Sequence, residues 1–155
     1  MVKSNGGEKG RVVCSNTGSG YYKDLANYDT YIDLKNIPEL SIVQKESTGI
    51  KFGASVSISK AIVELKKDNQ KIMNKIANYF EKIASESIRN SASLGGNLVM
   101  AQRSGFPSDI ATVFLSVDAT LEIITPFSKE TVKLEEFLKR PPLDSDSIIT
   151  NIKIP

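Results

Sequence analysis

Two short segments of the sequence carry residue types that suit the binding of a phosphate group. In the first, residues 11–20, the string RVVCSNTGSG leads from β-branched apolar residues into a turn rich in serine, asparagine, threonine and glycine. Successive backbone N–H groups of such a turn can converge on one anion, and a glycine such as Gly18 allows a positive φ or a close approach. Turns of this composition are common without any ligand, so this segment alone is a weak signal.

The second segment, residues 91–97, reads SASLGGN and follows a stretch with helical periodicity. Its adjacent glycines, Gly95 and Gly96, would let a ligand touch the backbone, and Ser93 and Asn97 offer hydrogen-bonding side chains beside them. The alternative is a tight turn that leads into a strand over residues 98–100. On this segment alone, the turn is the favoured interpretation.

A third candidate is the string FPSD at residues 106–109, which precedes an apolar run over residues 110–117. Ser108 or Asp109 would serve as the N-cap of a helix. Asp109 is also a candidate for a buried carboxylate that accepts a hydrogen bond from a hydroxyl group of a ligand. The two roles are compatible.

The composition excludes several kinds of chemistry. The chain has no histidine and one cysteine, Cys14, so most hydrolytic and zinc chemistry is disfavoured. One cysteine forms neither an intramolecular disulfide nor a four-thiolate iron–sulfur cluster, which fits a reducing compartment such as the cytosol. Any redox chemistry would therefore need an organic cofactor.

The charge pattern argues against nucleic acid and membrane surfaces as partners. The 155 residues include 20 basic and 18 acidic side chains, which gives a net charge of +2. The lysines of residues 60–82 alternate with acidic residues, as on a solvated helix face. No apolar run approaches the roughly 18 residues of a membrane span. Residues 1–10 are polar and glycine-rich, which predicts a disordered start rather than a secretory signal.

Hydrophobic periodicity predicts the elements that position these segments. Alternation or β-branched runs predict strands over residues 12–14, 31–34, 50–56, 117–123, 131–134 and 148–154, with a hairpin between the fourth and fifth. Three- and four-residue spacing predicts one helix from Lys60, capped by Ser57 or Ser59, and another over residues 72–84. A short helix over residues 135–139 ends before two prolines. The sum is an α+β fold with a mainly antiparallel sheet and helices on one face.

Taken in order, the segments resemble the FAD-binding domain of the molybdenum hydroxylases, the family of the xanthine dehydrogenases and aldehyde oxidases. The family's first flavin loop has the form LVVGNT, and residues 12–17 read VVCSNT. Its second loop has the form S-[IVL]-GGN, which SLGGN at residues 93–97 matches, and Asp109 fits an aspartate that follows. The strings IPEL, GIKFGASVSIS and RPPLDSDSIITNIKIP also match, and the stretches around both loops look most similar to plant aldehyde oxidases.

The resemblance covers roughly residues 10–155 and implies a two-lobed domain that binds FAD. Residues 1–10 would be the disordered start, residues 11–44 an incomplete first lobe and residues 45–155 the second lobe, with the polar segment 41–49 between them. The first flavin loop would line the pyrophosphate and adenosine portion of FAD with Arg11, Val12, Val13, Cys14, Ser15, Asn16, Thr17 and Gly18.

The resemblance also assigns roles to residues of the second lobe. Ser93, Gly95, Gly96 and Asn97 would form a second wall against the pyrophosphate. Asp109 would hold a ribityl or ribose hydroxyl. Leu143 matches a position that touches the flavin. Ile83 falls where xanthine dehydrogenases place an aromatic residue, and it can pack against the flavin ring but cannot stack on it.

The sequence departs from the family pattern at three places. Ser15 replaces the usual loop glycine and would stiffen the turn, and Gly18 stands where xanthine dehydrogenases carry an acidic residue. A strand and helix that precede the first flavin loop in the family are missing. The iron–sulfur and molybdenum cofactor domains, which are the partners expected from the resemblance, are also outside this sequence.

The resemblance predicts that the chain supplies only a flavin step. In the family, electrons pass from iron–sulfur clusters to FAD and on to oxygen or a nicotinamide, so we expect no aldehyde oxidation by this chain alone. The main alternative is a truncated, non-enzymatic paralogue that binds little FAD and pairs with a full-length relative through an exposed sheet edge. A module for another nucleotide is disfavoured, because neither GxGxxG nor GxxxxGK[ST] is present.

Overall fold

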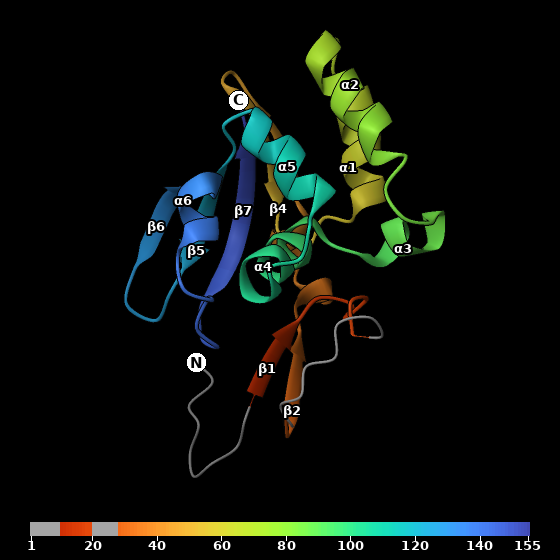
Figure 1. Cartoon of the computed structure of the whole chain (residues 1–155). Coiled ribbons are helices and arrows are strands. Elements are labelled where there is room, and N and C mark those ends of the chain that lie inside the picture. The colour runs from red at the N-terminus through yellow and green to blue at the C-terminus, as the bar shows by residue number, and fades with distance from the viewer. Residues whose placement is uncertain (1–9, 20–27) are drawn as a thin grey trace.

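The computed structural model describes residues 10–19 and 28–155, and it confirms the predicted α+β class. Most of the chain forms a five-stranded sheet of order β3-β4-β7-β5-β6, in which every neighbouring pair is antiparallel. Its strands are β3 (Val43–Glu46), β4 (Gly49–Gly53), β5 (Thr120–Ile124), β6 (Lys129–Lys133) and β7 (Ile148–Ile154). Helices cover one face of this sheet, as Figure 1 shows.

Two-residue alternation determines which side chains of the sheet are buried. Phe52 of β4 and Leu121 of β5 are fully buried, whereas Lys51 and Glu122 lie on the outer face. Strand β7 breaks the alternation, since both Ile149 and Ile152 are buried although they stand three residues apart. A register shift between β5 and β7 resolves this, because the additional residue in β7 returns both isoleucines to the core face.

The helices are α1 (Ile58–Lys66), α2 (Lys71–Phe80), α3 (Glu86–Ser91), α4 (Leu94–Ser104), α5 (Asp109–Ser116) and α6 (Leu134–Lys139). Caps and apolar spacing predict α1, α2, α5 and α6, but not α3 or α4. The hydroxyl of Ser57 caps α1, which confirms that prediction. Helix α2 ends at Phe80, earlier than predicted, and Ala84 takes a left-handed backbone conformation that no helix continues.

One predicted strand is wrong. Residues 98–100 belong to α4, not to a strand after a tight turn. Leu94 and Leu98 are both fully buried, so they place one face of a helix on the core at a spacing of four residues. The two glycines lower helix propensity only in the first turn, where the cap from Ser93 compensates.

The polar segment predicted to separate two lobes contains regular structure. Residues 41–49 include β3, so the predicted boundary between residues 44 and 45 falls inside a strand that pairs with β4. Two 3₁₀ turns, η1 (Leu34–Asn36) and η2 (Pro38–Ser41), precede that strand. The predicted strand over residues 117–123 begins only at Thr120, because Asp118 has a positive φ.

A second, smaller sheet joins β1 (Gly10–Val13) and β2 (Thr30–Asp33) in parallel. Figure 1 shows it apart from the helix-covered sheet, with the C-terminal end of β1 towards α4. The predicted disordered start lies outside the described residues, except for Gly10, which begins β1. Among the described residues, no helix is long and apolar enough to cross a membrane.

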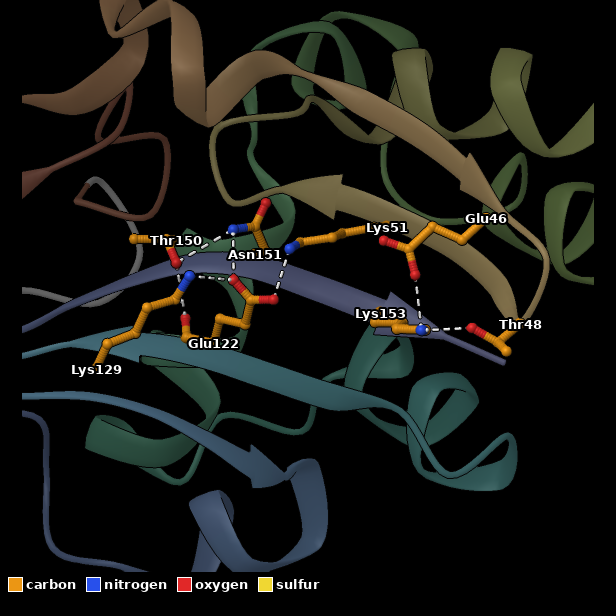
Figure 2. Close-up of polar contacts among 8 residues, drawn as sticks. All are labelled: Glu46, Thr48, Lys51, Glu122, Lys129, Thr150, Asn151 and Lys153. Carbon is orange, nitrogen blue, oxygen red and sulfur yellow. Dashed lines mark hydrogen bonds and ion pairs between the residues drawn. The ribbon is translucent and has the colours of Figure 1, made fainter.

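The outer face of the large sheet carries an ion-pair network, drawn in Figure 2. Glu122 lies 2.5 Å from Lys51 Nζ and 3.2 Å from Lys129 Nζ, and it also accepts from Asn151 Nδ2 at 3.1 Å. Partial burial raises the pKa of Glu122, but hydrogen bonds from the two lysines outweigh it and hold that pKa below its usual value. The network therefore pairs its charges and supports the sheet.

Candidate functional site

Residues 14–19, here called the 14–19 turn, follow β1 and have an unusual backbone. Ser15 and Asn16 have φ values of 56° and 48°, two successive residues in the left-handed region. Asparagine tolerates this conformation, whereas serine is strained in it. The N–H of Ser15 donates to Asp33 Oδ1 at 3.2 Å, and that carboxylate also accepts from Lys35 N at 2.9 Å. The turn is thus fixed against the end of β2.

The 14–19 turn presents backbone donors that no other described residue uses. Ser19 N donates to Asn16 O at 3.3 Å, but within the described part of the chain the N–H groups of Asn16, Thr17 and Gly18 have no hydrogen-bond partner. Asn16 and Thr17 are exposed. Successive free N–H groups in a turn of this kind form a concave site for an anion. The predicted phosphate-binding character of this segment therefore has a geometric basis.

Ser15 adds a second feature of a ligand site. Its Oγ atom is buried and has no hydrogen-bond partner among the described residues. An unpaired buried hydroxyl costs about 1–3 kcal/mol, and the left-handed backbone of a non-glycine residue costs a similar amount. Strained and unsatisfied groups of this kind gather at binding sites.

The start of α4 differs from the 14–19 turn because its backbone donors are already used. The N–H of Leu94 donates to Val56 O at 3.0 Å, and that of Gly95 donates to Ala54 O at 2.9 Å. Gly96 N donates to the capping hydroxyl of Ser93 at 3.0 Å. The first turn of α4 therefore offers no free N–H group to a phosphate, and a ligand must be met there by side chains.

The two glycines of this segment have different surroundings. Gly95 is buried, and a Cβ atom there would lie 2.7 Å from Ala54 Cβ and 2.9 Å from Ala54 O. Glycine is thus required at residue 95 for α4 to pack on the segment after β4. Gly96 is half-buried, and a Cβ atom there would meet only Ser93 Oγ. Of the two, Gly96 is the one whose backbone is accessible.

The 14–19 turn and α4 lie against each other. A Cβ atom at Gly18 would be in ordinary contact with Met100 Cε, at 3.8 Å. Asn97 precedes Met100 by three residues, so both lie on the same face of the helix. The structure thus brings together the two segments that the sequence singled out, although the 70 residues from 21 to 90 separate them in the chain.

Asn97 is joined to the start of α5. Its Oδ1 atom accepts a hydrogen bond from the hydroxyl of Ser108, and Ser108 Oγ accepts from Ala111 N at 2.9 Å as the N-cap of α5. This confirms a cap at this position. Asp109 is exposed rather than buried as expected, and it accepts from the Tyr79 hydroxyl at 3.3 Å. The sequence analysis missed the link from Ser108 to Asn97, because no spacing rule connects them.

Leu143 lies at the other end of α4. Its N–H donates to Gln102 Oε1 at 3.0 Å, and Gln102 Nε2 donates to Phe137 O at 2.8 Å. One amide side chain thus ties the residues after α6 to α4. The sequence analysis also missed Gln102, since a helical glutamine gives no signal of its own.

Two further candidates lie in the surroundings of these segments. Ile83 is half-buried between α2 and α3, where it packs against the core, and its carbonyl accepts from Arg89 Nη1 at 2.9 Å. Arg11 of β1 places its guanidinium 5.2 Å from the ring centre of Tyr28, a favourable cation–π contact. Val12, Val13 and Cys14 are half-buried.

Acid–base and metal chemistry find no support in the described residues. No group of three or more Asp, Glu, Cys or His side chains there is placed to hold a metal ion. The carboxylates with shifted pKa values, Asp68, Glu122 and Glu135, belong to ion pairs with lysines away from the 14–19 turn.

Among the described residues, a turn with unpaired backbone N–H groups approaches α4, which covers the antiparallel sheet, and this arrangement is compatible with a domain that binds an anionic cofactor. A family model described as the FAD binding domain in molybdopterin dehydrogenase matches residues 1–155. The chain belongs to this family, and FAD is the cofactor of the family. The 14–19 turn fits such a cofactor, because its free N–H groups and the unpaired Ser15 hydroxyl suit a diphosphate.

Plant relatives support the same assignment. The chain is 46% identical to abscisic-aldehyde oxidase of Arabidopsis thaliana over 158 residues, which covers 100% of this chain and 12% of that protein. It is 50% identical to probable aldehyde oxidase 1 of Oryza sativa subsp. japonica over 148 residues, or 94% of this chain and 11% of that protein. The chain thus spans about one eighth of the length of these relatives.

Solved structures share the fold at lower identity. Quinoline 2-oxidoreductase from Pseudomonas putida 86 superposes with a TM-score of 0.76 at 18% identity, over 94% of this chain and 51% of that chain. A carbon monoxide dehydrogenase from Hydrogenophaga pseudoflava gives 0.77 at 20% identity, over 96% and 52%. The two-layer arrangement described above is therefore that of a known fold.

Proposed function

We propose that this chain holds FAD between the 14–19 turn and the first turns of α4, as the flavin-binding part of an aldehyde-oxidising molybdenum hydroxylase. The observation that carries the proposal is the approach of Gly18 to Met100, which brings the 14–19 turn, with three backbone donors that have no partner among the described residues, to helix α4. The names of the plant relatives support aldehydes as the substrate class of the whole enzyme.

The hydrogen-bond donors available in each segment indicate which part of the cofactor that segment would bind. The N–H groups of Asn16, Thr17 and Gly18 bind the diphosphate, and the half-buried residues of β1 line the adjoining portion of the cofactor. Ser93, Gly96 and Asn97 form the second wall, with Gly95 holding that wall to the core. Asp109, Leu143 and Ile83 keep the roles of ribose contact and flavin contacts that the resemblance implies.

In this proposal the protein binds and orients the cofactor and does no proton transfer of its own. The flavin, when bound, accepts electrons and passes them on. We propose iron–sulfur domains of the same enzyme type as the donor, and oxygen or a nicotinamide as the acceptor. A cytosolic location and the absence of aldehyde oxidation by this chain alone stay predictions of the sequence.

Retention of FAD is the direct test. The purified chain is incubated with FAD and desalted, and its visible spectrum is recorded. Stoichiometric retained flavin absorbance supports the proposal. A folded but colourless protein overturns it and favours the alternative, a non-enzymatic paralogue. Size-exclusion chromatography with the corresponding domain of a full-length relative then tests pairing. Competition by ATP or NADH at stoichiometric levels would instead indicate a module for another nucleotide.

A further inference from the structure

The first turn of α4 makes one donor available to a ligand, and that donor belongs to a side chain. The N–H groups of Leu94, Gly95 and Gly96 donate to protein oxygens, and that of Asn97 donates to Ser93 O at 3.1 Å. The side-chain amide of Asn97 is half-buried, and within the described part of the chain its Nδ2 atom has no acceptor. An amide nitrogen carries two donor hydrogens.

The orientation of that amide is determined by Ser108. The hydroxyl oxygen of Ser108 accepts the N–H of Ala111 at 2.9 Å, and its one proton is donated to Asn97 Oδ1. If the amide were turned by 180°, its nitrogen would face Ser108, and the buried hydroxyl proton would lose its acceptor. Leaving such a group unsatisfied costs about 1–3 kcal/mol. The amide oxygen therefore faces Ser108 and the nitrogen faces away.

Asn97 lies on the face of α4 that is directed towards the 14–19 turn. It shares this face with Met100, whose Cε lies 3.8 Å from the position that a Cβ atom would take at Gly18. Two linked hydrogen bonds thus run from the start of α5 towards the region between the 14–19 turn and α4. The first joins Ala111 N–H to Ser108, and the second joins the Ser108 hydroxyl to the Asn97 amide.

We propose that Ser108 is a positioning residue for FAD: its hydroxyl holds the Asn97 amide so that Nδ2 donates to an oxygen of the cofactor. This inference rests on the proposed function, because it assigns the donor of the second wall. The acceptor is an oxygen of the diphosphate, the ribityl chain or the flavin ring, all of which accept hydrogen bonds. Comparison of FAD with FMN, which lacks the adenylate half, locates the acceptor.

The test distinguishes two roles of Ser108: positioning the Asn97 amide and capping helix α5. Ser108→Gly removes the hydroxyl, while glycine at an N-cap costs the helix only a few tenths of a kcal/mol. We expect FAD affinity, measured by fluorescence quenching on the full chain, to fall about tenfold in Ser108→Gly, the loss of one hydrogen bond. Ser108→Thr keeps a hydroxyl and should restore most of the affinity. Ser57→Gly is the matched control, because it removes the α1 cap, which accepts from Lys60 N at 3.2 Å.

A double-mutant cycle tests whether Ser108 acts on FAD binding through Asn97. Asn97→Ala should weaken FAD binding at least as much as Ser108→Gly, and adding Ser108→Gly to Asn97→Ala should cause no further loss. Additive effects, or unchanged affinity in Ser108→Gly, overturn the inference. A loss of affinity in Ser57→Gly of the same size also overturns it, since any lost cap would then suffice.

If Ser108→Gly does not fold, Asn97→Asp tests whether the Asn97 amide donates to FAD. The aspartate keeps an acceptor for Ser108 but has no donor, so FAD affinity should fall as in Asn97→Ala. Wild-type affinity in Asn97→Asp overturns the inference. Failure of the wild-type chain to bind FAD is a different result, because it rejects the proposed function itself.

Discussion

The two sheets of this chain differ in how they are stabilised. In the large sheet, β4, β5 and β7 each contribute side chains with essentially no exposure, such as Phe52, Leu121 and Ile152. In the small sheet, no residue of β1 or β2 is fully buried. A two-stranded sheet without a buried face is marginal by itself, so the small sheet depends on its contacts with the rest of the chain.

The proposed binding region joins a rigid wall to a less stable one. Helix α4 stands on the core through Leu94 and Leu98, whereas the 14–19 turn is held by Asp33 and the contact at Met100. Elements with few buried contacts open at low free energy. We therefore expect a bound cofactor to stabilise the small sheet more than the large one.

The largest expected effect comes from the core beneath the helices. Phe80 of α2 and Phe114 of α5 are fully buried and meet edge to face, with ring centres 5.6 Å apart. Phe80→Ala should lower the free energy of unfolding by about 3–5 kcal/mol. Urea denaturation followed by circular dichroism measures it. Val12→Ala in half-buried β1 is the comparison and should cost about 1 kcal/mol; equal losses would contradict the difference between the sheets.

Disrupting the packing of the start of α4 on Ala54 should have the next largest effect. Gly95→Ala places a methyl group 2.7 Å from Ala54 Cβ, so α4 must shift, at a cost of about 1–3 kcal/mol. FAD retention should fall with it, because the shift moves Asn97. Gly105→Ala is the control, since a Cβ atom there meets nothing within 4 Å and only the φ of 59° is strained. It should cost about 1 kcal/mol and leave FAD retention unchanged.

A change in the 14–19 turn, which follows the small sheet, should stabilise the fold instead of destabilising it. Ser15→Gly removes both the strained left-handed serine and its unpaired buried hydroxyl. Allowing for the greater freedom of glycine in the unfolded chain, the net gain should be about 1 kcal/mol. Thermal unfolding without FAD measures it. Asn16→Gly is the control and should gain less, because asparagine tolerates a positive φ. A lower melting temperature for Ser15→Gly would contradict this account of the turn.

The smallest effect concerns acid stability at the edge strand β3. Asp68 is buried between α1 and α2, and its pKa is lowered by its hydrogen bond with Lys45 of β3 and by that from Gln70 N. A lowered folded-state pKa gives stability that is present above the unfolded value of 3.8 and lost as the pH falls through the folded value. The urea midpoint of the wild type should therefore decline below about pH 4.

Asp68→Asn should flatten that decline, since asparagine does not titrate. Glu135→Gln is the matched control: Glu135 also has a lowered pKa, owing to its hydrogen bond from Lys139, but both side chains of this pair are exposed. An exposed pair contributes little, so its removal should leave the pH profile as in the wild type. A profile unchanged in Asp68→Asn would show that the Lys45 pair does not matter to β3.

The sequence predicted the fold class and most elements because burial repeats in short patterns. The alternation in residues 50–56, the β-branched run in residues 148–154 and the three- and four-residue spacing after Ile72 correspond to β4, β7 and α2. The prediction from the sequence was wrong at residues 98–100, which lie in a helix, and it missed the strand within residues 41–49. In the first, apolar residues suit a strand or a helix equally, and in the second an edge strand exposes its side chains and so has no apolar pattern.

Turn chemistry is local, so the sequence alone shows two segments whose residue types suit a phosphate and which resemble those of one family. How their donors are shared depends on the tertiary structure. Helix α4 uses its first backbone N–H groups for packing on Ala54 and Val56, those of Asn16, Thr17 and Gly18 have no partner among the described residues, and Ser108 lies against Asn97. A hydrogen bond between distant residues depends on where the sheet and helices place them, and no spacing along the chain encodes that position.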